Sequence, residues 1–90
     1  MPVHYEILGT VEHFWERVGA VGIRLESAQL SEGERIAFEL PIEYEEQIVT
    51  SLQVDNEQVA IAQAPALVGL RTDLTKEQLR NGTRVYRVIA

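Results

Sequence analysis

The sequence predicts an all-β fold: a small, closed or nearly closed barrel of six or seven strands, formed by residues 1–90 as a single domain. Apolar residues recur with a period of two over most of the chain, which is the spacing of a half-buried strand. Glycine, proline and asparagine interrupt these runs at short intervals, as in barrels and sandwiches. The chain has 90 residues, 46% of them apolar. A domain this small must hide its strand edges, and closure of the sheet achieves this.

Six segments carry the alternation of a strand. In residues 20–25 it turns Val21, Ile23 and Leu25 inward and Arg24 outward. Three further segments show two distinct faces: residues 6–14 (Ile7, Val11 and His13 opposite Leu8, Thr10, Glu12 and Phe14), residues 35–40 (Ile36, Phe38 and Leu40 opposite Arg35 and Glu39) and residues 47–54 (Ile48, Leu52 and Val54 opposite Ser51 and Gln53). Another strand begins at Val68 and Leu70. The last strand contains Val85, Tyr86, Val88 and Ile89. Residues 57–64 suit either a strand or a helix, and we expect a strand.

The connections have recognisable turn chemistry. Glycine at positions 19 and 33 supplies a positive φ without steric cost, and Pro41 ends the strand before it because it has no backbone donor. Asp55 and Asn56 both tolerate positive φ, which predicts a two-residue hairpin turn. One short helical turn is expected near Thr75–Leu79, with Thr75 as the N-cap, Gln78 completing a capping box and Gly82 ending the turn.

Composition excludes several kinds of site. The chain has no cysteine, which removes disulfides and thiolate metal sites and fits a reducing compartment. Its first residues lack the basic and apolar regions of a signal peptide. No apolar run approaches the ~20 residues of a membrane-spanning helix. We therefore expect a cytoplasmic protein without a membrane partner.

The charge is negative overall but unevenly distributed. A net charge of −6 argues against nucleic acid as a default partner, because lysine and arginine drive phosphate binding. Residues 67–90 nevertheless carry five basic and two acidic side chains, against three basic and twelve acidic ones in residues 1–66. Such asymmetry can create opposite surface patches, or it can arise from chance and solubility.

Short glycine-based motifs resemble a known family. They are Gly9-Thr10-Val11, the hairpin Gly19-Ala20-Val21-Gly22-Ile23, Glu32-Gly33-Glu34, Val68-Gly69-Leu70, and the final run from Gly82 to Val88. In this order they resemble the second-domain β-barrel of translational GTPases such as elongation factor Tu. They are also similar to small translation elongation factor-like proteins and to the C-terminal barrel of collagenase-like peptidase-family proteins, several of which act in RNA modification. The turn Ala64-Pro65-Ala66 departs from that pattern. No G-x-x-x-x-G-K-[ST] loop is present, so no nucleotide site is expected.

The resemblance implies a non-catalytic accessory barrel associated with translation or RNA modification. Its partner would be tRNA or another RNA, or an RNA-modifying or translation protein. The basic residues Arg71, Lys76, Arg80, Arg84 and Arg87 would then line a phosphate-contacting edge; the alternative is a set of solvated side chains paired with nearby acids.

The first hairpin holds a second candidate surface. An exposed Trp15 close to Arg17 can stack a base or anchor a protein partner. Strand alternation places Phe14 on the face opposite Trp15, so at least one of the two aromatic side chains should be buried. The alternative function is therefore a protein-interaction module without direct RNA contact, which uses residues 14–17 and the acidic residues 43–46.

We expect no enzymatic activity, no metal and no cofactor. His4 and His13, even beside Glu12 and Glu16, lack the spacing of a zinc site. The acidic residues Glu39, Glu43, Glu45 and Glu46 are expected to form a solvated loop around Pro41, where carboxylates stay ionised. The serines Ser27, Ser31 and Ser51 have no nucleophile elbow and no triad partners.

Overall fold

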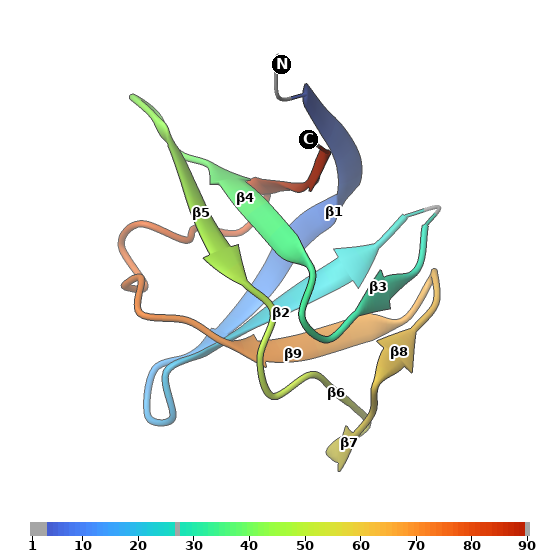
Figure 1. Ribbon diagram of the computed structural model, residues 1–90. Coiled ribbons are helices and arrows are strands. Elements are labelled where there is room, and N and C mark those ends of the chain that lie inside the picture. Colours follow the sequence, from blue (N-terminus) through green and yellow to red (C-terminus); the bar gives the residue numbers. More distant parts are fainter. Residues whose placement is uncertain (1–3, 27, 90) are drawn as a thin grey trace.

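The computed structural model describes residues 4–26 and 28–89, which form ten strands and no helix (Figure 1). The strands are β1 (His4–Trp15), β2 (Ala20–Leu25), β3 (Leu30–Ser31), β4 (Arg35–Glu39), β5 (Tyr44–Ile48), β6 (Gln53–Val54), β7 (Glu57–Gln58), β8 (Ile61–Ala62), β9 (Leu67–Arg71) and β10 (Arg84–Ile89). The expected all-β class is therefore confirmed. No helix of the described chain is long and apolar enough to cross a membrane.

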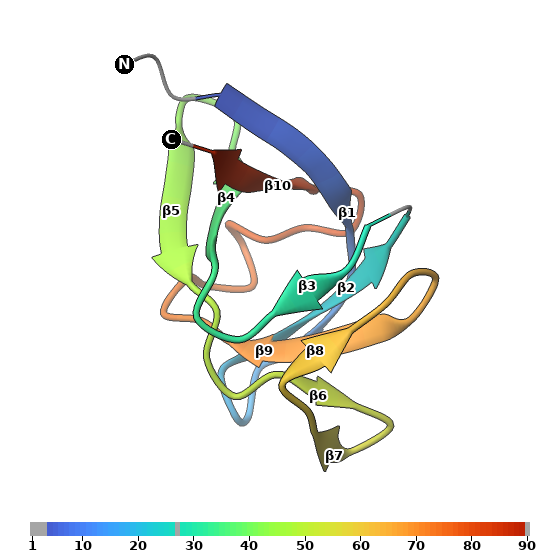
Figure 2. The ribbon, with the colours of Figure 1, turned by 45° about the vertical axis from the view of Figure 1, so that its right-hand side comes forward.

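Eight of the strands form one antiparallel sheet in the order β5-β4-β10-β1-β2-β9-β6-β7, and β3 pairs with β8 in a second, two-stranded sheet. The large sheet curls around the interior of the molecule (Figures 1 and 2). Within the described residues neither sheet closes on itself, because the order of the large sheet ends at β5 and β7. Of the two expected forms, the closed barrel is therefore not found in the described residues, and the nearly closed form stays a prediction. Bonds join the β5 end of the sheet to the end of β9: the Gln47 amide donates to the Arg71 carbonyl (2.8 Å), the Thr72 hydroxyl donates to the Gln47 amide oxygen (2.8 Å), and the Arg71 N–H donates to the Thr50 carbonyl (3.3 Å).

The core lies inside the curl and is fully apolar. No polar or charged side chain of the described residues is buried. The period of two correctly predicted the buried side chains of β2, where Val21, Ile23 and Leu25 are all buried. It also did so for β4, where Ile36 and Phe38 are fully buried. The other members of the cluster are Leu8, Val11, Leu30, Val49, Leu52, Ala62, Val68, Leu70, Leu79 and Val85.

Strand β1 departs from the expected alternation. Both Leu8 and Val11 are buried although they lie three residues apart, whereas Ile7 is exposed. The cause is a pair of irregularities in register, between Ile7 and Gly9 against β10 and between Val11 and His13 against β2. An extra residue in one strand of a ladder shifts every later side chain to the other face.

The predicted strand over residues 47–54 is also wrong. The chain leaves β5 after Ile48, and Ser51 adopts a left-handed φ of 55° before β6 begins. As a result Val49 and Leu52 are buried and Ile48 is exposed, the reverse of the expected pattern for residue 48. This break also ends the long strand that would have helped to close the barrel.

The predicted turns form as expected. Asp55 (φ 53°) and Asn56 (φ 66°) join β6 to β7 in a two-residue hairpin. Residues 57–64 are extended rather than helical, although they form two short strands, β7 and β8, instead of one.

The expected helical turn near Thr75–Leu79 is a single hydrogen-bonded turn, without the length of a helix. Its capping box nevertheless forms: the Gln78 N–H donates to the Thr75 hydroxyl (3.3 Å), and the Thr75 N–H donates to the Gln78 side-chain oxygen (2.9 Å). The turn carries Leu79 into the core.

Candidate binding surface

Trp15 lies on the outer face of the large sheet, above two glycines. Gly22 of β2 and Gly69 of β9 are direct cross-strand partners. A Cβ atom added to Gly22 would lie 3.0 Å from Cη2 of the indole, and one added to Gly69 would lie 3.4 Å from its Cζ3. The six-membered ring therefore covers both glycines. Glycine inside a strand often marks such a close approach, and here it lets a large ring lie against the backbone with 39% of the residue still exposed.

An open groove of about 850 Å³ runs from Trp15 across β9 to the β6–β7 hairpin. Its floor includes Gly69 and Leu67, and its far wall is formed by the hairpin. The polar side chains along it are Arg24, Ser51, Gln53, Asp55, Asn56, Gln58 and Arg71. We call this feature the Trp15 groove. It combines an aromatic surface with amide groups that can both donate and accept hydrogen bonds.

The two arginines of the groove differ in their availability. Arg24 is held by Glu12 through two contacts of 3.2 Å, and its guanidinium also donates to the Pro65 carbonyl (3.0 Å). Arg71 is exposed and forms no ion pair within the described residues. Of these two cations, Arg71 is therefore the one available to a ligand.

The first hairpin places its aromatic residues as alternation predicts. Phe14 packs against the core, and Trp15 is on the outer face. His13 stands edge-on to Trp15, with ring centroids 4.8 Å apart, and supports one side of the indole. Nowhere in residues 4–26 and 28–89 do three His, Asp or Glu side chains converge as metal ligands.

Of the predicted binding residues, the structure brings only Trp15 and Arg71 together in the groove. Arg17 lies in the β1–β2 turn, next to the groove residue Val18. Arg80 lines a separate shallow recess with Glu39 and Glu77, and Arg84 is exposed at the start of β10. Of the predicted basic residues, only Arg71 therefore lines the groove, and the phosphate-contacting edge stays a prediction.

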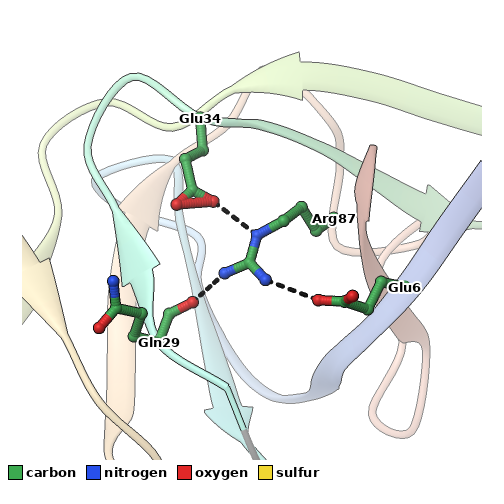
Figure 3. A network of polar contacts seen from close by, with 4 residues as sticks. All are labelled: Glu6, Gln29, Glu34 and Arg87. Carbon is green, nitrogen blue, oxygen red and sulfur yellow. Dashed lines mark hydrogen bonds and ion pairs between the residues drawn. The ribbon is translucent and has the colours of Figure 1, made fainter. Parts of the chain in front are cut away.

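Arg87 has a structural role instead of the expected binding role. Its Nε donates to Glu34 (2.8 Å), one terminal nitrogen donates to Glu6 (2.7 Å), and the other donates to the carbonyl of Gln29 (Figure 3). The side chain is only 21% exposed. Burial alone would lower its pKa, but the hydrogen bonds and charges of Glu34 and Glu6 outweigh this effect, so the pKa of Arg87 lies above its ordinary value. These contacts use three of the five N–H donors and pair the charge with two carboxylates, so Arg87 is less available to a phosphate than an unpaired arginine.

The acidic residues do not form the expected solvated loop. Glu39 belongs to β4, and Glu45 and Glu46 belong to β5, so only Glu43 lies in the connecting turn. Glu39 accepts hydrogen bonds from the hydroxyls of Tyr44 (3.3 Å) and Tyr86 (3.0 Å). The mistake arose from Pro41, which marks the end of a strand but gives no information on how soon the next one begins.

Sequence reasoning missed the wall and floor of the groove. Gln53, Asn56 and Gln58 carry no motif. The signal that could have revealed the floor is a glycine inside each of two apolar runs, at positions 22 and 69, together with a nearby tryptophan.

Comparisons with known proteins identify the fold. No family model matches the chain, and no curated protein matches it. Among solved structures it is similar to the C-terminal domain of a predicted U32 peptidase from Geobacillus thermoleovorans, with a TM-score of 0.78 and 17% sequence identity over 94% of this chain and 93% of that one. A selenomethionine variant of that domain also has a TM-score of 0.78, at 16% identity over 91% of this chain and 99% of that one. The chain therefore shares the fold of this C-terminal peptidase domain, as the resemblance to collagenase-like peptidase-family proteins predicts.

Proposed function

We propose that this chain is a non-catalytic accessory domain that binds single-stranded RNA, such as a loop or an end of a tRNA, in the Trp15 groove. The observation that carries the proposal is the indole of Trp15, whose six-membered ring lies over the Gly22–Gly69 pair while 39% of the residue stays exposed. A rigid, exposed aromatic face is the platform on which unpaired bases stack, and it accepts any base.

The rest of the groove suits the same ligand. Arg71 supplies a free positive charge for a phosphate. Gln53, Asn56 and Gln58 offer amide groups for base edges and 2′-hydroxyls. The resemblance to tRNA-handling barrels and the fold shared with the C-terminal domain of a predicted peptidase both support an accessory role, in which the domain presents RNA to a partner protein in the cytoplasm.

Electrostatics set the character of this binding. The chain carries a net charge of −6, so stacking rather than counterion release has to supply most of the affinity. If Arg71 and Arg17 each neutralise one phosphate, the logarithm of the affinity falls against the logarithm of the salt concentration with a slope of only about −1.4. A highly basic RNA-binding protein would show a much steeper slope.

The test is a titration with unfractionated tRNA, monitored by the fluorescence of Trp15, the single tryptophan of the chain, and by amide chemical shifts at two salt concentrations. We expect fluorescence changes and shifts at Gly22, Gln53 and Gly69. Because base stacking on an aromatic side chain is strong, Trp15→Ala should weaken binding roughly tenfold or more. Arg71→Gln should weaken it less and flatten the salt dependence.

Arg80→Gln is the matched control, because Arg80 is also exposed and basic but lies outside the groove. It should leave binding unchanged. Absence of any shift at low salt, or equal losses for Arg71→Gln and Arg80→Gln, would contradict the proposal and favour a protein-interaction module without RNA contact.

A further inference from the structure

Three tyrosines form a cluster on the outer face of the other half of the large sheet. Tyr5 of β1 stacks on Tyr44 of β5, with ring centroids 4.8 Å apart, and Tyr86 of β10 lies 5.9 Å from Tyr5 and 5.8 Å from Tyr44. These are all the tyrosines of the chain. We call this surface the tyrosine face. It does not share a residue with the Trp15 groove.

The tyrosine face is built on a small floor of its own. Ala37 of β4 is fully buried but lies outside the contiguous cluster of apolar side chains in the interior. The register places it directly between Tyr86 and Glu46, and directly opposed residues of an antiparallel sheet point to the same side. Ala37 is therefore covered from the outside by the tyrosine rings, and its small side chain lets the three rings approach one another.

Carboxylates hold the rings in place. Glu39 accepts from Tyr44 and Tyr86, and Glu46 accepts from Tyr5 (3.1 Å). Among the described residues, Glu46 is paired with Arg35 at 3.5 Å, whereas Glu39, Glu43 and Glu45 form no ion pair. The β4–β5 hairpin, residues 35–48, contains four glutamates and one arginine. On the tyrosine face itself, Glu39 and Glu46 therefore hold their carboxylates at fixed positions beside the rings.

The same hairpin provides a free strand edge. Strand β5 pairs with β4 on one side and with no described strand on the other. The Leu40 N–H donates to the Glu43 carbonyl, and the Val49 N–H donates to the Glu34 carbonyl, so the odd-numbered residues direct their backbone groups toward β4. Antiparallel strands alternate in this respect, which leaves the backbone groups of Tyr44 and Glu46 directed toward the free edge, beside the tyrosine face.

We propose that the tyrosine face and the free edge of β5 bind an extended segment of a partner protein that carries arginine or lysine at alternate positions. The segment would add a strand to β5 and lay its cationic side chains over the tyrosine rings and against Glu39 and Glu46. Cations bind favourably over aromatic faces. Ile42, at the tip of the hairpin, is 97% exposed and offers an apolar contact beyond the end of the strand.

Charge selects this occupant over a second copy of the chain. Two β5 edges brought together would oppose Glu45 and Glu46 of one copy with the same residues of the other, and like charges across a ladder are destabilising. Carboxylates on an edge strand commonly prevent such self-pairing. A partner strand that carries arginine or lysine avoids this repulsion between like charges.

The experiment uses the full chain, labelled for amide chemical shifts, and two short synthetic peptides, one alternating threonine with arginine and one alternating threonine with glutamate. We expect the arginine peptide to shift residues 44–48 and to leave the fluorescence of Trp15 unchanged. Tyr44→Ala should weaken its binding about fivefold or more. Glu39→Gln, which keeps the shape of the side chain, should also weaken it.

Glu57→Gln is the matched control, because Glu57 lies on β7, the opposite edge of the same sheet. It should leave the affinity for the arginine peptide unchanged. Equal binding of the glutamate peptide, shifts at residues 57–58 as large as those at 44–48, or full affinity in Tyr44→Ala would each overturn the proposal. The proposed RNA function can fail without affecting this result, since the two surfaces are separate.

Discussion

Single glycines decide how closely the strands of this protein approach. At Gly9 a Cβ atom would lie 1.9 Å from the carbonyl oxygen of Arg24, at the position where β1 shifts its register. The contact is with backbone, which cannot rotate away. Gly33 differs: nothing lies within 4 Å of the position that a Cβ atom would take there, but its φ of 92° is one that other residues rarely adopt.

Gly9→Ala should therefore lower the free energy of unfolding by about 3 kcal/mol, through a steric clash in the sheet. Gly33→Ala should cost about 1 kcal/mol, through backbone strain alone. Urea denaturation followed by circular dichroism measures both. Equal losses for the two variants would show that the approach of β1 to Arg24 is not rigid.

The tyrosine face predicts a response to alkaline pH. Partial burial and the neighbouring Glu46 raise the pKa of Tyr5 above 10.0, and partial burial with Glu39 and the adjacent phenols raises the pKa of Tyr44. Because the folded state favours the protonated phenols, this contribution to stability is complete below pH 10.0 and is lost as the pH rises through the raised pKa values. Ring chemical shifts should show both phenols ionising at higher pH in the native protein than in urea. Coincident titrations would contradict the contacts with Glu39 and Glu46.

Among the elements, predictability depends on regular pairing. Strands β2 and β4 contain no extra residue of their own, since the irregularity of the β1–β2 ladder lies on β1, so their period of two predicted which side chains are buried. The prediction of which β1 side chains are buried failed because the two register shifts leave no trace in the local sequence except Gly9. The break after β5 could not be predicted for a similar reason, since Ser51 adopts a positive φ that serine rarely shows.

The candidate sites were predictable only where they are formed by residues that are close together in the sequence. Trp15 was identified because it follows a strand at a hairpin. The internal partners of Arg87 could not be predicted, because Glu6 and Glu34 are 81 and 53 residues away in sequence. The tyrosine face combines three strands that are distant in sequence, so only the topology reveals it.

The connection from β9 to β10 contains a turn that acts as a support for the core. Thr75→Ala removes the hydroxyl that accepts from the Gln78 N–H, and it should lower the free energy of unfolding by about 1 kcal/mol, as for the loss of an N-cap. Leu79 would lose part of its support. Lys76→Ala, at the neighbouring exposed position, should change stability by less than about 0.5 kcal/mol. Equal stability of the two variants, measured by urea denaturation, would show that the capping box contributes nothing.

At the scale of the whole molecule, the curled sheet separates two outward surfaces. The Trp15 groove lies over β2, β9 and β6, and the tyrosine face lies over β5, β4, β10 and the first half of β1. Within the described residues, Arg71 and Asp55 are the charged groups of the first surface that form no ion pair, and glutamates adjoin the second. The two surfaces differ in chemistry, but the excess of basic residues in 67–90 does not make the groove basic, because Arg87 is engaged elsewhere and Arg80 and Arg84 do not line it.

Arg87 adds side-chain bonds to the ladder that already joins β10 to β1, and it also reaches two segments outside that ladder. Its guanidinium links β10 to β1, to the turn before β4 and to the segment before β3 (Figure 3). Arg87→Met, which retains the length of the side chain, should lower the free energy of unfolding by about 2 kcal/mol, because it leaves Glu34 and the Gln29 carbonyl without their charged partner. Glu6→Gln should cost less than about 1 kcal/mol, since Glu6 is half exposed. A loss for Arg87→Met no larger than that for Glu6→Gln would contradict this role.

The pairing of β1 with β10, in which His4 lies opposite Ile89, has a consequence for how the protein is made. During synthesis on a ribosome β1 emerges before the other described strands, and it waits for one of its two neighbours until β10 has been translated. Contacts between such distant segments are slow to form. Until then Leu8 and Val11 are only partly covered by β2, so the nascent chain keeps apolar surface exposed to water and to chaperones until β10 has left the ribosome.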